Sequence, residues 1–314
     1  MLLGVPEAWH LLDEAAREGD PAVLAALVAV GPRQLPREHR ARWAALVDSL
    51  YDAVLSHTAS GLWGHSTIRS LGDWAAYAPG LAERLSRTVC DLDRRAHWAG
   101  VASVLCDLAS STLPHPLGGA APGSVLHDAV AELLAALDFP EGGCDAVGDR
   151  DLPALQRLRS LVRPSATHDS GPELLEALAG QLAGQPLLAS ERADLLRSLV
   201  DLWAEPEDLT RRMDDLAAAL EDAGVVVAGQ VAGRLRPHGG HRALPQHAAT
   251  LLTVADRLVR DGRVGAGLLA AALVAGTGTV LSWPEAWRVL LRALRRHPRP
   301  DVRHEAFRIL TENE

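Results

Sequence analysis

The chain has 314 residues, a formal net charge of −9 and an apolar content of 48%, which is the composition of a folded globular protein. Every basic residue is arginine, which excludes the usual forms of Schiff-base enzymes, P-loop NTPases and protein kinases, because each requires a lysine amine. The acidic balance also argues against a general nucleic-acid-binding domain, since such domains normally carry a basic excess.

The core must be built mainly from Leu, Ala and Val, because aromatic residues make up only 4% of the chain. Leu and Ala are strong helix formers, so composition alone favours helix. The three cysteines Cys90, Cys106 and Cys144 are widely spaced and odd in number, which is typical of free thiols in a reducing compartment. The first residues lack the basic segment of a signal peptide, and we expect a cytoplasmic protein.

Apolar residues recur at three- and four-residue steps along most of the chain, which predicts amphipathic helices. The clearest runs lie at 43–54, 126–137, 209–220, 287–294 and 302–310. No stretch alternates with a period of two, so the predicted fold class is all-α, with about 13 to 15 helices. Asp20-Pro21 and Ser282-Trp283-Pro284-Glu285 have the composition of helix N-termini, the second as a capping box.

Residues 264–283 carry no charge, as a membrane-spanning helix would. However, four glycines dilute the segment, and Gly276–Thr279 has the composition of a helix end and loop. We therefore predict a buried helix of about 13 residues and no membrane insertion.

Longer breaks rich in Gly and Pro lie at 111–123, 139–150 and 164–171. We take the first as the boundary between an N-terminal half, 1–113, and a C-terminal half, 124–314. One continuous solenoid is the alternative.

The last 31 residues, from Pro284 on, resemble a HEAT repeat. A helix with Leu290, Leu291 and Leu294 is followed by a proline-containing turn, then by Asp301-Val302-Arg303 and a second apolar face. This resemblance implies an α-solenoid of stacked antiparallel helix pairs, of the HEAT or armadillo kind. Proteins of this kind mostly act as binding scaffolds.

Three groups of residues are candidates for binding. The segment 61–77 is rich in Trp, Tyr and Arg, which are enriched at interaction hot spots, and this favours a partner-binding role. Its aromatic residues would equally serve to fill gaps between helices. Arginines at helical steps, and a glycine-rich loop with two histidines, are candidates for holding an anion. The partner-binding candidates are Trp63, His65, Arg69, Trp74 and Tyr77, and the anion-binding candidates are Arg288, Arg292, Arg295, Arg299, Arg236, His238 and His241.

No catalytic motif, cofactor fingerprint or metal-ligand spacing stands out, so we expect no catalytic residues, no cofactor and no metal. The hypothesis is a non-catalytic scaffold that binds a protein partner. The alternative is a nucleic-acid-binding HEAT-like protein, similar to the helical-repeat DNA glycosylases, that uses the C-terminal arginine rows. The oligomeric state stays open.

Overall fold

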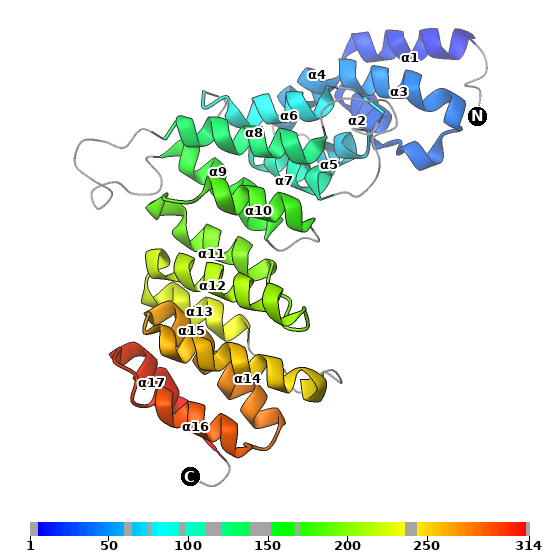
Figure 1. The fold of residues 1–314 in the computed structure, drawn as a ribbon. Helices are drawn as coiled ribbons and strands as arrows, with labels where there is room; N and C mark the ends of the chain where they lie inside the picture. Colours follow the sequence, from blue (N-terminus) through cyan, green and yellow to red (C-terminus); the bar gives the residue numbers. More distant parts are fainter. Residues whose placement is uncertain are drawn as a thin grey trace. The chain divides into compact units, whose positions relative to one another are not determined.

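The computed structural model describes residues 6–59, 65–74, 77–78, 80–93, 98–110, 121–137, 152–166, 170–235 and 244–311. These residues form α-helices and short 3-10 helices and contain no strand, which confirms the all-α prediction (Figure 1). The chain divides into two compact units, Met1–Leu174 and Leu175–Glu314. The predicted boundary between 113 and 124 falls largely on residues outside the described ranges.

The N-terminal unit stacks helices that mostly contact near neighbours along the chain. Its central helix is α7, which packs against α5, α6, α8 and α9. Gly72 of α5 permits one close approach, because a Cβ there would lie 2.9 Å from Val104 Cγ1 of α7. The α-helices described in this unit are α1 (Pro6–Glu18), α2 (Pro21–Ala29), α3 (Arg37–Ser49), α4 (Tyr51–Ala59), α5 (His65–Trp74), α6 (Leu81–Cys90), α7 (Trp98–Ala109), α8 (Pro122–Ala135) and α9 (Pro153–Ser165).

Two polar contacts fix helix ends in this unit. Asp20 caps α2 as predicted, since its Oδ1 accepts from the backbone N–H groups of Ala22 at 2.8 Å and Val23 at 3.2 Å. The buried Arg157 guanidinium of α9 donates to the carbonyls of Val89 and Asp91, both at 2.6 Å, where α6 ends. Because the last carbonyls of a helix have no partner within it, Arg157 ties α9 to the end of α6.

The C-terminal unit is also a stack of helices whose packing is consistent with a solenoid-like arrangement, with contacts between chain neighbours and between helices two or three positions apart. Helix α15 lies at its centre, packed against α12, α13, α14, α16 and α17. The described α-helices are α10 (Pro172–Gln181), which begins at the division between the units, α11 (Ala189–Ser198), α12 (Pro206–Ala223), α13 (Val225–Arg234), α14 (Leu244–Asp261), α15 (Val264–Val280), α16 (Glu285–Leu294) and α17 (Pro300–Arg308).

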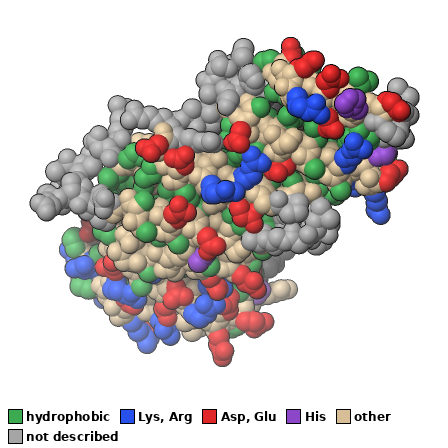
Figure 2. All heavy atoms as spheres, turned by 90° about the horizontal axis from the view of Figure 1, so that it is seen from above, with side chains coloured by type: hydrophobic (Ala, Val, Ile, Leu, Met, Phe, Trp, Pro, Cys, Tyr) green, Lys and Arg blue, Asp and Glu red, His purple; other side chains and the backbone are tan. Residues whose placement is uncertain are grey.

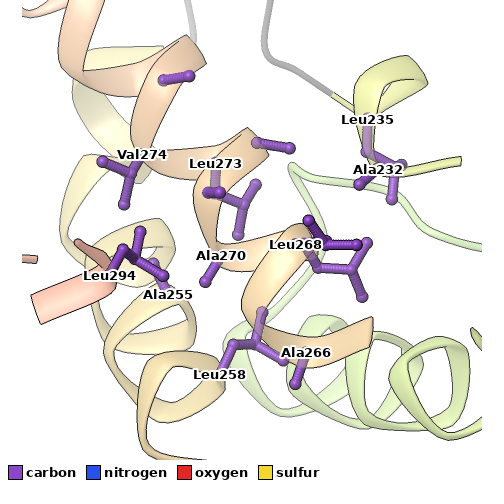
Figure 3. Close-up of a cluster of buried hydrophobic side chains, with 14 of the residues drawn as sticks. Ala232, Leu235, Ala255, Leu258, Ala266, Leu268, Ala270, Leu273, Val274 and Leu294 are labelled. Carbon is purple, nitrogen blue, oxygen red and sulfur yellow. The ribbon is translucent and has the colours of Figure 1, made fainter. Parts of the chain in front are cut away.

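Helix α15 is apolar on all sides, and neighbouring helices cover all of them. Figure 3 shows its side chains, among them Leu268 and Leu273, meeting those of α13, α14 and α16. Glycines let the neighbours approach closely. A Cβ at Gly265 would lie 2.8 Å from Ala217 O, and one at Gly267 would lie 2.6 Å from Val302 Cγ2. The segment at 264–283 is therefore a core helix, as predicted.

The predicted end of this helix was wrong. Helix α15 continues through Gly276–Thr279 to Val280 and has 17 residues. Gly278 is needed inside the helix because the Trp283 indole folds back against it, where a Cβ would lie 2.6 Å from the ring. No helix in the described part of the chain is both long enough and apolar enough to cross a membrane.

The capping box at Ser282 was also wrong. Ser282 and Trp283 both have positive φ, and the N-cap of α16 is Pro284, with no side-chain hydrogen bond. The backbone turns here to bury the Trp283 side chain, and the backbone N–H of Trp283 donates to the Gly278 carbonyl at 2.8 Å. Burial of one large aromatic side chain thus outweighs the local capping preference.

Candidate functional site

Helix α16 has a buried face and an exposed face of different chemistry. Trp287, Leu290, Leu291 and Leu294 are buried, as the sequence periodicity predicts. The opposite side carries Glu285, Val289, Arg292 and Arg296, which are all exposed. Glu285, Val289 and Arg292 share one face of the helix because they are four and three residues apart, and Arg296 follows in the turn after Leu294.

Helix α17 and the residue pair that follows it add apolar surface. Val302, Ala306 and Ile309 are buried, whereas Phe307 is 62% exposed and Leu310 is 79% exposed. The prediction that Leu310 continues the buried face was wrong, because α17 ends at Arg308 and the chain leaves the helical register there. Sequence periodicity carried past the helix end therefore missed an exposed leucine.

The α16–α17 pair is basic in an acidic chain. Residues 285–308 contain seven arginines and three acidic residues, so they carry an excess of four positive charges, whereas the whole chain is at −9. The face of the molecule that Figure 2 shows, viewed from above relative to Figure 1, has basic and acidic side chains interspersed. The name basic face is used below for the exposed residues Val289, Arg292, Arg296, Arg299, Phe307 and Leu310.

The predicted row of Arg288, Arg292, Arg295 and Arg299 does not act as one set of free cations. Arg295 is half-buried, donates to the Ile309 carbonyl at 3.1 Å and lies over the Phe307 ring at 5.7 Å. Arg292 forms an ion pair with Glu285.

Two arginines of the basic face are left available. Arg296 and the guanidinium of Arg299 are exposed and form no ion pair with another described residue. Arg303, by contrast, donates to the His297 carbonyl at 2.8 Å and the Pro298 carbonyl at 2.9 Å.

His297 lies in the turn between the two helices and is buried. Its Nδ1 accepts from the Arg299 backbone N–H at 3.3 Å, and its Nε2 is buried without a hydrogen-bond partner. Burial lowers the pKa of His297, and the charges of Arg299 and Arg303 lower it further. The turn is therefore built around a neutral imidazole.

The predicted partner-binding segment is only partly described. Trp63 lies outside the described residues, and His65 and Arg69 lie on α5 with side chains that are also outside them. Trp74 is fully buried and donates from Nε1 to the Val30 carbonyl at 2.9 Å, as the core-filling alternative expects. Tyr77 is half-buried, and its hydroxyl accepts from Arg40 at 3.2 Å.

The glycine-rich loop with Arg236, His238 and His241 also lies outside the described residues. Its anion-binding role stays a prediction.

Two surface depressions could not be predicted from the sequence, because each depends on side chains from different helices. One, of about 290 Å³, is lined by Tyr51, Asp52, Arg84, Arg87, Thr88 and Asp91, and the other, of about 570 Å³, by Pro206, Glu207, Thr210, Arg211, Asp214, Asp215 and Arg257. Their charges are largely paired: Arg84 donates to Asp48 at 2.9 Å and to Asp52 at 3.1 Å, and Arg257 pairs with Asp214. Within the described ranges, no three His, Cys, Asp or Glu side chains gather as a metal site would require.

No protein-family model matches the chain, and no curated protein or solved structure is similar enough to it to count as a match. The fold and the surfaces described above are therefore the basis for any functional conclusion.

Proposed function

We propose that the chain is a non-catalytic, HEAT-like helical-repeat scaffold that binds a protein partner on the basic face. The observation that carries the proposal is the combination of exposed Val289, Phe307 and Leu310 with Arg296 and Arg299, whose guanidinium groups form no ion pair with another described residue. Large apolar side chains beside uncompensated cations fit a partner helix that has both apolar and acidic residues.

The HEAT-like assignment is supported by the C-terminal unit. Helix α16, the turn around His297 and helix α17 follow the order expected of such a repeat, and Arg303 holds the turn carbonyls. Stacked helix pairs of this kind present side chains from successive helices as an extended binding surface.

Nucleic-acid binding through the same arginines is the alternative, and three contacts make it less favoured. Arg295 and Arg303 donate to backbone carbonyls, and Arg292 pairs with Glu285. A phosphate-binding row needs cations that are free to replace counterions along the backbone. Exposed Phe307 and Leu310 would also contribute little to contacts with phosphates.

A fluorescence anisotropy titration of the full chain tests the proposal. The probe is a labelled helical peptide with Glu and Leu on one face, and we expect saturable binding that Phe307→Ser/Leu310→Ser weakens by about tenfold or more. Val226→Ser is the matched control, because Val226 of α13 is equally exposed but lies outside the basic face.

Two results would overturn the proposal. The first is absence of peptide binding at low salt. The second is tighter binding of a mixed-sequence DNA duplex that falls steeply with salt and is lost in Arg292→Ala/Arg296→Ala/Arg299→Ala, which would establish the nucleic-acid alternative.

A further inference from the structure

Helix α1 has an exposed face with the opposite charge to the basic face. Glu7, Leu11, Glu14 and Glu18 are all exposed, and Leu11 is 64% exposed. Their spacing of four, three and four residues aligns them along one side of the helix. Helix α1 therefore presents a leucine with three carboxylates on a single face.

The other side of α1 attaches it to its own unit. Trp9 is buried and lies edge-on to Trp43 with ring centroids 5.9 Å apart. Arg42 lies over the Trp9 ring at 4.5 Å and comes within 4.0 Å of Asp13. These contacts hold the face with Leu11 toward solvent.

The carboxylates of this face outnumber the basic residues of α1, of which Arg17 is the one arginine. Glu7, Glu14 and Glu18 form no ion pair with any other described residue, whereas Asp13 on the attached side is close to Arg42. Helix α1 as a whole has four acidic residues and one arginine. It is thus an acidic helix with one exposed leucine, which is the chemistry that the basic face fits.

The two faces have matching residue order as well as opposite charge. Helix α16 exposes Glu285, Val289 and Arg292, and Arg296 follows in the turn after the helix, at the same spacing of four, three and four. When the two helices run in the same direction, Leu11 lies opposite Val289, and Glu14 and Glu18 lie opposite Arg292 and Arg296. Glu7 then lies opposite Glu285, the carboxylate that pairs with Arg292. The reverse direction would place Leu11 against Arg292 and Glu18 against Glu285, and would keep only one charge pair, Glu7 with Arg296.

We infer that α1 of one copy of this chain docks on the basic face of a second copy, so that the chain self-associates head to tail. The inference rests on the proposed function and names the partner of the same site. The contact is heterologous, so a docked pair still has one free α1 at one end and one free basic face at the other. Further copies can add at both ends, and the assembly grows with protein concentration.

Charge reversal in the full chain provides the test. Glu14→Arg/Glu18→Arg and Arg292→Glu/Arg296→Glu each place like charges on both faces, so we expect each variant alone to associate about tenfold or more weakly than the wild type. An equimolar mixture places opposite charges across every contact again, so it regains association. Sedimentation velocity over a concentration series measures both effects, and about 1 M salt, which shortens the screening length to about 3 Å, weakens wild-type association.

Glu173→Arg/Glu207→Arg is the matched control, because both carboxylates are exposed in the first turns of other helices. We expect it to associate as the wild type does. Recovery of association in the mixture also shows that both reversal variants are folded.

The inference is overturned by a wild-type chain that stays monomeric over the whole series, by reversal variants that associate like the wild type, or by a mixture that stays monomeric. If the acidic peptide still binds in these cases, the proposed function stands and only the identity of the partner falls. If the peptide also fails, both fall together.

Discussion

Replacing Gly265 with alanine is expected to destabilise the C-terminal unit, although the same change usually stabilises a helix. Gly265 lies in the first turn of α15, where α15 meets α12. Its backbone N–H donates to Glu221 Oε1 at 2.7 Å, which fixes the helix start close to its neighbour. A new Cβ would stand 2.8 Å from both Ala217 O and Leu220 Cβ.

The magnitude follows from these distances. Carbon atoms in good contact are about 3.5–4.0 Å apart, so α15 would have to retreat by roughly 0.7 Å from atoms that cannot rotate away. Overpacking of this kind costs about 1–3 kcal/mol. The helix propensity of alanine returns at most about 1 kcal/mol. We therefore expect a net loss of about 1–2 kcal/mol in the free energy of unfolding.

Urea unfolding followed by circular dichroism measures this loss as a lower midpoint at unchanged slope. Gly229→Ala is the control, because Gly229 is inside α13 of the same unit and a Cβ there meets nothing within 4 Å. That variant should gain about 0.5–1 kcal/mol from helix propensity alone. A Gly265→Ala protein as stable as Gly229→Ala would refute the close-packing argument.

Other predictions concern buried groups. Arg157→Ala should lower the free energy of unfolding by about 3 kcal/mol or more, measured by thermal unfolding, because it removes the donor to the carbonyls at the end of α6. Arg157→Lys should not restore this stability, since one ammonium group cannot reproduce the geometry of the guanidinium. Burial raises the pKa of both Cys90 and Cys106 to about 12, so only about one thiol in ten thousand ionises at pH 8. In a Cys144→Ser background a thiol reagent should therefore label neither until urea unfolds the chain, and fast labelling of the native protein would contradict this. The lowered pKa of His297 means that the unfolded chain binds its proton more readily. Stability should thus fall as pH drops below about 6.5. The denaturant midpoint of His297→Gln should depend less steeply on pH than that of the wild type. An equal slope in the wild type and the variant would contradict this.

Much of the fold could be predicted because its signals are local. The buried faces of α3, α12 and α16 follow the apolar spacing of the sequence, as Trp43, Leu216 and Trp287 show. The cap at Asp20 also depends only on residues adjacent in sequence. Helix ends were predicted less well: α15 continues to Val280, with Trp283 packed against Gly278, and α17 ends at Arg308 although the apolar spacing continues to Leu310.

The candidate site could be predicted only in part. The excess of positive charge in the last two helices is visible in the sequence itself. The sequence did not indicate which arginines remain available, because Arg295 and Arg303 are engaged by carbonyls of Ile309 and His297 that only the folded turn brings within reach. The acidic face of α1 was present in the spacing of Glu7, Leu11, Glu14 and Glu18, but burial of Trp9 was needed to show which side faces solvent.

The sequence by itself determined that the chain is helical and which stripe of most helices is buried, because backbone geometry repeats every 3.6 residues whatever lies nearby. Only the tertiary structure decided that α15 is surrounded on every side, that Leu310 is exposed and that Arg157 is enclosed among the carbonyls of α6. These outcomes depend on how closely separate helices approach. Glycines such as Gly265 set that approach, and their effect depends on a neighbour that is distant in sequence.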